Sequence, residues 1–282
     1  DRFNSAISLL GSSETSARTG AIYALYELAI EEEKYRSQIT QILCSHIRSK
    51  TDEAEYKKTH SERPSNEIQT TINLLFKEKE EGLYTQDFAR VDGFPKVNLS
   101  HAYLMGADFT AAWCQNAVFE DAQCQGAIFI NARCQKADFI VAQCQNAVFI
   151  NAQCQGASFT NAQCQGASFT NAQCQGAGFW SSQCQGADFS DAQCQGAGFM
   201  SAECQGAHLR YAECQGAGFS NAKFDQPLDI QIEGEISDKA IKAIEYAQPY
   251  LDNYWYEKMQ QIIKENKGKD PKKVNAQTLT SD

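Results

Sequence analysis

The chain has 282 residues and a formal net charge of −10, with 25 Lys and Arg against 35 Asp and Glu. A broad nucleic-acid-binding surface is therefore not expected. No stretch approaches the roughly 18 apolar residues of a membrane span, and no signal-peptide pattern is present.

Residues 1–50 are expected to form an N-terminal helical segment. The stretch "RFNSAISLL" opens the chain, and a break at 11–13 follows, with Ser13 as a candidate N-cap. Apolar residues then recur at helical spacing through "SARTGAIYALYELAI". The stretch "YRSQITQILCSHI" predicts a further helix.

Residues 51–96 are expected to lead from these helices into a repeat. The first part, up to Pro64, is polar and charged and predicts a linker. Ser65 can cap a helix that runs to about Glu81, with Gly82 at its C-terminal end.

Residues 97–226 repeat with a period of five and a modulation of ten. In 26 consecutive units, the first residue is Ala except at Val97 and Ser182, and the third is Leu, Phe or Cys. This period fits neither a helix nor a simple alternation of inward and outward residues. It is met if each unit forms one side and one corner of a coil. Ala and the central residue then point inward, and Gly or Asn turns the corner.

The alternation of Phe and Cys at the centre of the units sets the number of sides. Three sides would mix both residue types in each column, whereas four sides keep the columns pure. One column is expected to hold Phe109, Phe129, Phe149, Phe169, Phe189 and Leu209, and the opposite one Phe119, Phe139, Phe159, Phe179, Phe199 and Phe219. The two columns between them hold Cys114, Cys124, Cys134, Cys144, Cys154, Cys164, Cys174, Cys184, Cys194, Cys204 and Cys214.

The pattern stops at Pro227. Residues 227–266 are expected to form a capping strand, "LDIQI", and two helices separated by Pro249. Residues 267–282 are expected to be a disordered tail. Helical flanks at both ends would protect the open edges of a solenoid.

The A-D/N-L/F-x-x pattern resembles the pentapeptide-repeat proteins. The resemblance implies a β-solenoid, namely a right-handed quadrilateral β-helix, here with α-helical N- and C-terminal flanks. Cys as every second central residue departs from the family's preference for Leu or Phe. The N-terminal segment resembles the HEAT-like helices that precede the repeats in many bacterial relatives. In several relatives a membrane-spanning segment lies further upstream, so an anchor before Asp1 is compatible with the resemblance.

The cysteines are interpreted as core residues. Cys is a small, often buried side chain that fits beside two Phe rings. Metal binding or redox buffering by the cysteines is an alternative, but no CxxC pair is present and the four His are scattered. No metal ligands and no cofactor are therefore predicted. Free thiols in this number favour the cytoplasm.

Two groups of outward residues are candidates for a contact surface. Ile128, Ile130, Val148 and Ile150 lie on one Phe face, and Trp180 and Met200 lie on the other, beside Gly178, Gly198 and Gly218. Either the protein's own flanking helices cover these groups, or they bind a protein partner or a second copy.

The sequence predicts a non-enzymatic scaffold or protein-interaction module, because no nucleophile–base pair, P-loop or metal motif is present. The resemblance also allows a DNA mimic that binds gyrase, as in quinolone-resistance relatives. Mimicry needs rows of exposed carboxylates. The nine acidic residues of the repeat form no continuous column: Asp108, Glu120, Asp121, Asp138, Asp188, Asp191, Glu203, Glu213 and Asp225.

Overall fold

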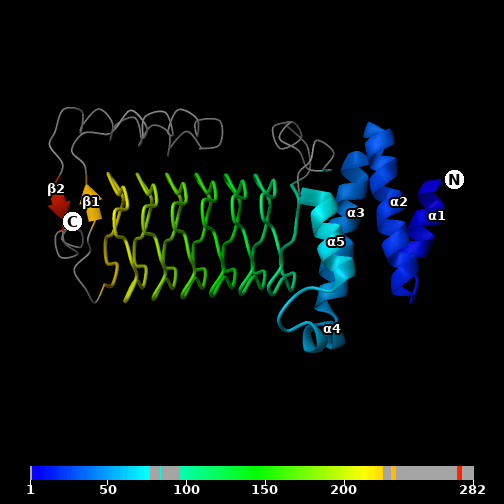
Figure 1. The fold of residues 1–282 in the computed structure, drawn as a ribbon, viewed down its shortest axis with the longest axis horizontal. Coiled ribbons are helices and arrows are strands. Elements are labelled where there is room, and N and C mark those ends of the chain that lie inside the picture. The colour runs from blue at the N-terminus through cyan, green and yellow to red at the C-terminus, as the bar shows by residue number, and fades with distance from the viewer. Residues whose placement is uncertain (1, 77–82, 84–95, 225–229, 233–271, 275–282) are drawn as a thin grey trace.

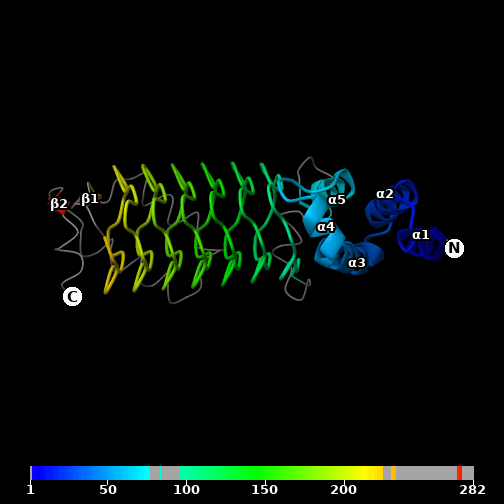
Figure 2. The same ribbon diagram turned by 90° about the horizontal axis from the view of Figure 1, so that it is seen from below.

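The computed structural model of the protein describes residues 2–76, 83, 96–224, 230–232 and 272–274. Five helices come first: α1 (Arg2–Leu10), α2 (Thr15–Glu31), α3 (Glu33–Asp52), α4 (Ala54–Thr59) and α5 (Asn66–Phe76). A long coil follows, and the strands β1 (Ile230–Ile232) and β2 (Lys272–Val274) pair antiparallel. The helices lie at one end of the rod, and β1 and β2 lie beyond the other (Figures 1 and 2).

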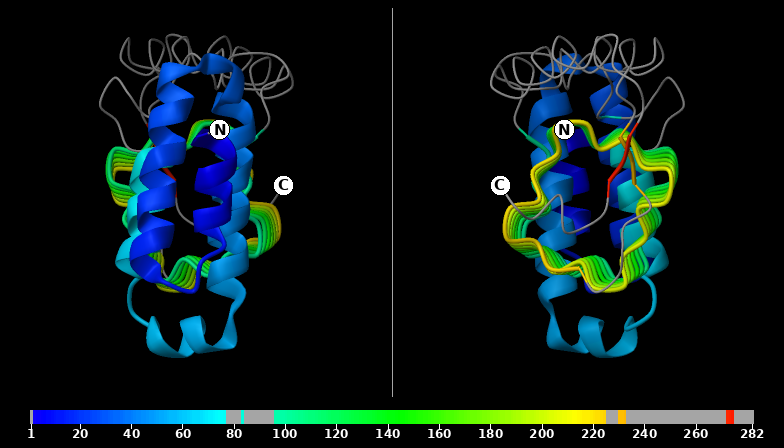
Figure 3. Two further views of the ribbon diagram at one scale, coloured as in Figure 1. Left: turned by 90° about the vertical axis from the view of Figure 1, so that its right-hand side faces the viewer. Right: turned by 90° about the vertical axis from the view of Figure 1, so that its left-hand side faces the viewer.

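The coil is a β-solenoid that closes every twenty residues. Parallel bridges join Asn98 to Val118 and Val118 to Asp138, and the same step continues through the stack. Hydrogen bonds link successive coils, for example from Phe129 N to Val148 O at 2.7 Å. Four units therefore complete one coil, and the coils superimpose when viewed along the rod (Figure 3).

The coil has four faces, which we name by the central residues of their units. The first Phe face carries Phe109 to Leu209, and the first Cys face carries Cys114 to Cys214. The second Phe face begins at Leu99 and carries Phe119 to Phe219, and the second Cys face begins at Leu104 and carries Cys124 to Cys204. Within each unit, the residues before and after the central one point outward.

The core has the predicted columns. Phe129 stacks on Phe149 with ring centroids 4.7 Å apart and an interplanar angle of 2°. Across the core, Phe139 meets Phe149 edge to face at 5.5 Å, a favourable aromatic geometry. The two Phe columns thus touch in the middle of the coil, and the small Cys side chains occupy the space on either side of them. Every predicted core Phe and Cys is at most 2% exposed, so the cysteine-rich core is confirmed.

The corners of the coil use the left-handed backbone region. Gly166 has φ +67° and Asn161 has φ 56°, and both residue types accept this region readily. Val141 has φ 59°, where a β-branched side chain is strained. At this corner, the coil therefore holds Val141 in a backbone conformation that valine disfavours.

A buried ion-pair network joins α2, α3 and α5. Arg18 donates to the Glu67 carboxylate through Nε at 2.9 Å and Nη2 at 2.7 Å, and His46 Nε2 lies 2.7 Å from Glu67 Oε1. The Glu67 side chain is only 2% exposed. Burial alone would raise the pKa of Glu67, but the hydrogen bonds from His46 and Arg18 lower this pKa to about 2.

The helical segment differs from the sequence prediction in two places and agrees with it at Ser65. The N-cap of α2 is Glu14, with no side-chain cap, so Ser13 does not have that role. The expected linker from residue 51 to 64 contains the end of α3 and the whole of α4. Ser65 caps α5 as predicted, since its Oγ accepts from Ile68 N at 3.3 Å, but the helix is described only to Phe76.

The helices close the N-terminal edge of the coil. The first coil has no preceding coil to pair with, and α3 and α5 supply the missing partners. Thr51 Oγ1 accepts from Tyr103 N at 3.1 Å, and Phe76 O accepts from Trp113 N at 2.9 Å. The Gln69 side chain pairs with both backbone groups of Asp108, at 2.9 and 3.0 Å.

Two further contacts complete this closure. Arg48 Nη1 donates to Asn98 O, so each of the four sides of the first coil meets a residue of α3 or α5. The buried Phe76 ring packs on Phe109 with centroids 5.6 Å apart, which extends the aromatic column into the helices. The predicted capping by the N-terminal flank therefore has a structural basis in these contacts.

At the other end, the strand expected in "LDIQI" is β1, and its partner is β2. β2 lies inside the predicted disordered tail of 267–282, so over these three residues the structure has a strand instead. The helices predicted within 227–266 lie outside the described residues.

Candidate functional site

The outer surface of the coil follows one geometric rule. In each unit, the side chain that follows the central residue lies over a side chain of the next coil. That second side chain stands eighteen positions later in the sequence, just before the central residue of its own unit. Gln125 Nε2 thus donates to Gln143 Oε1 at 2.7 Å on the second Cys face. Gln175 Nε2 donates to Gln193 Oε1 at 2.6 Å on the first Cys face. Over most coils both Cys faces are therefore ladders of amides that bind the coils together, and towards the C-terminal end Glu203 and Glu213 replace the accepting Gln.

The predicted aliphatic group lies on the first Phe face, in two consecutive coils. Ile128, Ile130, Val148 and Ile150 are all partly exposed. The hydroxyl side chains of Thr110 and Thr170 occupy the same outward column in the flanking coils. Among the described coils of this face, the aliphatic group is therefore bounded on both sides by polar residues.

Trp180 and Met200 lie on the second Phe face and are 38% and 46% exposed. The indole of Trp180 lies over the next coil, because a Cβ on Gly198 would come 1.9 Å from Trp180 Nε1. A side chain at position 198 would therefore clash with the Trp180 indole, so this position requires glycine. The structure keeps this pair apart from the aliphatic group, since the two lie on opposite faces.

Two exposed apolar residues of the coil were missed from the sequence. Val141 is 42% exposed at a corner of the second Phe face, and Tyr211 is 44% exposed in the last coil. The signal was present in the unit "ADFIV", which places Val where most units have Gly or Asn. Arg210 stacks on Tyr211, with the guanidinium 4.8 Å from the ring.

The acidic residues are distributed over all four faces and make local contacts. Asp138 Oδ1 accepts from Ile140 N at 2.9 Å, and Asp121 lies 2.9 Å from His101 Nδ1. Glu203 pairs with Lys223 at 3.0 Å. No row of carboxylates of the kind that DNA mimicry requires is formed by the described residues, and Asp225 lies outside them.

The thiols lie in the buried interior of the molecule. All twelve cysteines are free and buried. Burial raises the pKa of the Cys134 thiol well above its usual range, and that of Cys44 to about 12. Hydrogen bonds from the thiols of the adjacent coils lower the pKa of Cys184 and Cys194. Because all the thiols are sealed from solvent, we expect them to react slowly in the folded protein.

Among the described residues, no three or more His, Cys, Asp and Glu side chains form a group that could hold a metal ion. In the same part of the chain, no helix has the length and apolar character needed to cross a membrane.

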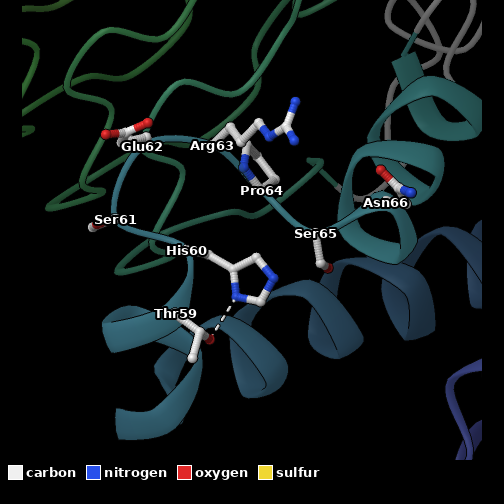
Figure 4. A pocket seen from close by; sticks show the side chains of 8 residues that line it. All are labelled: Thr59, His60, Ser61, Glu62, Arg63, Pro64, Ser65 and Asn66. Carbon is white, nitrogen blue, oxygen red and sulfur yellow. Dashed lines mark hydrogen bonds between the residues drawn. The ribbon is translucent and has the colours of Figure 1, made fainter.

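A hollow of about 410 Å³ lies at the α4–α5 loop and is lined by residues 59–66 (Figure 4). Its groups already have structural roles. The His60 ring stacks on Tyr56 with centroids 4.3 Å apart, and Thr59 Oγ1 lies 2.9 Å from His60 Nδ1. The loop also presses on the coil, since a Cβ on Gly106 would meet Glu62 O at 2.1 Å. The hollow is therefore a by-product of the loop that joins the helices to the coil.

Comparison with protein families agrees with this geometry. The family model described as pentapeptide repeats matches in eight copies between residues 108 and 226. Residues 108–226 are pentapeptide repeats. The match begins in the third unit of the repeat and includes none of the five helices, and no curated protein matches the chain.

Several solved structures of pentapeptide-repeat proteins are similar to the chain. HetL, involved in heterocyst differentiation regulation in the cyanobacterium Nostoc sp. strain PCC 7120, is 25% identical, with a TM-score of 0.39. That match covers 46% of this chain and 68% of HetL. QnrB1, a plasmid-mediated fluoroquinolone resistance protein, is 24% identical, with a TM-score of 0.31 and coverage of 46% and 65%. Rfr23 from the cyanobacterium Cyanothece 51142 is 17% identical, with a TM-score of 0.19 and coverage of 34% and 62%.

Proposed function

We propose that this right-handed, four-sided coil is a rigid, non-enzymatic scaffold that presents a protein-binding surface. The observation that carries the proposal is the aliphatic group on the first Phe face. Ile128, Ile130, Val148 and Ile150 fill both outward positions in two consecutive coils, and they are bounded by polar residues. Clustered apolar side chains on a polar surface commonly mark a contact site.

The coil suits this role because its backbone is ordered before binding. Each coil is hydrogen-bonded to the next, and stacked Phe rings fill its interior. A surface that is already rigid loses little conformational entropy when a partner binds. The expected partner is a protein with an apolar contact surface, or a second copy of this chain.

The test is the double variant Ile130→Asp with Ile150→Asp. Its control is Thr110→Asp with Thr170→Asn, which changes the same outward column; an amide is placed at position 170 because Thr170 donates to Asp188 at 3.1 Å and a carboxylate there would repel Asp188. We expect the first variant to lose the associations that the parent and the control retain, as measured by sedimentation velocity and by quantitative comparison of co-purified proteins from the source cells. If every association is unchanged in the first variant, the aliphatic group is not the binding surface.

We also propose that the protein acts in the cytoplasm, or at the cytoplasmic face of a membrane if an anchor precedes the chain. Support comes from the twelve free thiols, because a reducing compartment keeps thiols unpaired. Fractionation of the source cells, with detection of the native full-length product, tests this location.

A further inference from the structure

The first Phe face is open along both of its edges. At the edge towards the second Cys face, the corner residues Asn146 and Gly166 are exposed. At the edge towards the first Cys face, Asn151 and Asn171 are exposed. The coils superimpose when viewed along the rod, so the face runs straight along it (Figure 3). A partner that lies along the rod can therefore reach the aliphatic group and the coils on either side of it.

The outward column before the central residues places a carboxylate on each side of the aliphatic group. Parallel bridges define this column, which runs through Asp108, Ile128, Val148, Ser168 and Asp188. Asp108 thus lies one coil before the aliphatic residues, and Asp188 lies two coils after them. Both carboxylates are partly exposed. Along the rod, the column therefore has the order acid, apolar, apolar, hydroxyl, acid.

The backbone of the same coil fixes each of these carboxylates. Asp108 Oδ1 accepts from Thr110 N at 2.8 Å. Asp188 Oδ1 accepts from Ser190 N at 2.9 Å, and Thr170 Oγ1 donates to Asp188 at 3.1 Å. Burial alone would raise the pKa of Asp188, but the hydrogen bonds from Ser190 and Thr170 lower this pKa. The Asp188 side chain is therefore held in one place as an anion.

The spacing of this face suits an α-helix that lies along the rod. A helical turn rises about 5.4 Å, close to the coil spacing of ~4.8 Å. Four coil steps separate Asp108 from Asp188, which is roughly 19 Å, and four helical turns rise roughly 22 Å. In an extended segment, side chains on one side recur only every ~6.6 Å, so they do not match the coils. A helix is about 10 Å wide and covers both outward columns of the face.

A second copy of the chain fits this face less well. The face is six coils long among the described residues, which is roughly 29 Å, and its flat part is about three extended residues, or roughly 10 Å, wide. That area of roughly 300 Å² is less than half of the ~800 Å² that each partner of a stable complex buries. The net charge of −10 also favours a basic partner over another copy of the same acidic chain.

We propose that the first Phe face binds a basic amphipathic helix of a partner protein, which lies along the rod. Apolar residues in two successive turns of that helix cover the aliphatic group. A Lys or Arg one turn before them pairs with Asp108, and another two turns after them pairs with Asp188. This inference rests on the proposed function, because it assigns the chemistry of the partner that the aliphatic group binds.

The probe is a synthetic helical peptide of about 20 residues. It carries Leu in two successive turns of one side, Lys one turn before them and Lys two turns after them, with Ala and Gln elsewhere. Fluorescence anisotropy measures its binding to the full chain. We expect binding, and we expect the same peptide with Glu in place of both Lys to bind roughly tenfold more weakly. A peptide of the same composition in which Leu and Lys alternate with the other residues should not bind.

The carboxylates are tested by the double variant Asp108→Asn with Asp188→Asn. It removes both charges, and the Asn side-chain oxygens can still accept from the backbone. The matched control is Asp138→Asn on the opposite face, where Oδ1 accepts from Ile140 N at 2.9 Å. We expect the double variant to bind the Lys peptide roughly fivefold more weakly than the parent, and the control to bind it unchanged.

The neutral double variant Ile130→Asn with Ile150→Asn separates this inference from the proposed function. If it binds the Lys peptide as tightly as the parent does, the aliphatic group is not the contact and the proposed function fails. If it loses binding but the Lys and Glu peptides bind the parent equally, the aliphatic group stands and the basic helix is wrong. The inference also fails if the Lys peptide does not bind the parent, or if the rearranged peptide binds as tightly.

Discussion

In the coil, each core ring meets the ring twenty residues on, whereas in α1–α5 the buried contacts join residues at irregular separations. Phe139, Phe149 and Phe159 belong to one repeated arrangement. The Arg18–Glu67–His46 network occurs once and joins three helices. The coil is therefore stabilised by many similar contacts, and the helical cap by a few contacts that have no substitute.

The difference extends to what each region leaves available for function. In the coil, outward positions outside the Gln ladders and Gly198 can vary, because the backbone ladder and the core do not depend on them. In the cap, Gln69, Thr51 and Phe76 are all engaged with the first coil. The helices therefore close the N-terminal edge of the coil, and under the proposed function its outer faces carry the binding surface.

The largest expected effect tests the division of the core between large and small residues. Phe159→Ala should lower the free energy of unfolding by roughly 3–5 kcal/mol, because a ring that contacts four other rings is lost. Cys164→Ala, in the neighbouring unit, should lower it by about 1 kcal/mol, because it removes only one small buried group. Chemical denaturation of both variants gives the two values. Equal losses would contradict the view that the Phe columns, and not the thiols, carry the core.

The second-largest expected effect concerns the Arg18–Glu67–His46 network of the helical cap. Glu67→Gln should lower the free energy of unfolding by about 3 kcal/mol, since it leaves the buried Arg18 without its counter-ion. The matched control is Glu31→Gln, whose partner Arg2 is exposed, and no measurable loss is expected there. Thermal denaturation of the two variants checks the contrast.

The same carboxylate gives the cap a pH dependence. The pKa of Glu67 is lowered to about 2 in the folded protein, compared with about 4.3 in an unfolded chain. Its contribution to stability is therefore complete above about pH 4.3 and is lost as the pH falls towards 2. In the Glu67→Gln variant, this part of the pH dependence should disappear from the unfolding curves. An unchanged profile would show that the network does not stabilise the cap.

The smallest effect concerns the strained corner. Val141→Asn should raise the free energy of unfolding by about 1 kcal/mol, because Asn accepts a positive φ with less strain. Asn161→Val, at the same corner one coil further on, should lower it by a similar amount. If both variants change the free energy of unfolding in the same direction, the backbone preference of the corner residue does not govern the stability of the coil.

The regular part of the fold could be predicted from the sequence because each unit repeats the same pattern of inward and outward residues. Ala and the central residue of each unit define the inside, and the Phe/Cys alternation requires an even number of sides. The bridges at twenty-residue intervals agree with four. The helices could be placed only approximately. Nothing in "AEYKKT" distinguishes the helix α4 from a polar linker, because its order depends on Tyr56 packing against His60 and Tyr103.

The candidate surface was predicted in part. Ile130 and Trp180 interrupt the decamer with large apolar residues, so the sequence marks them directly. The sequence did not indicate that Gly198 lies under Trp180, because that contact joins residues eighteen positions apart. The closure of the first coil by Gln69 and Thr51 also had no local signal, since these residues act through distant backbone groups.

Eleven of the cysteines pack inside the coil, and under the proposed function they have no chemical role and the binding surface lies on the outer faces. Thiol titration of the native full-length chain, compared with the denatured chain, tests this most directly. We expect all twelve thiols to react promptly after denaturation and none to react on the same timescale in the native protein. Several thiols that react rapidly in the native protein, or a metal ion released on denaturation, would contradict the account.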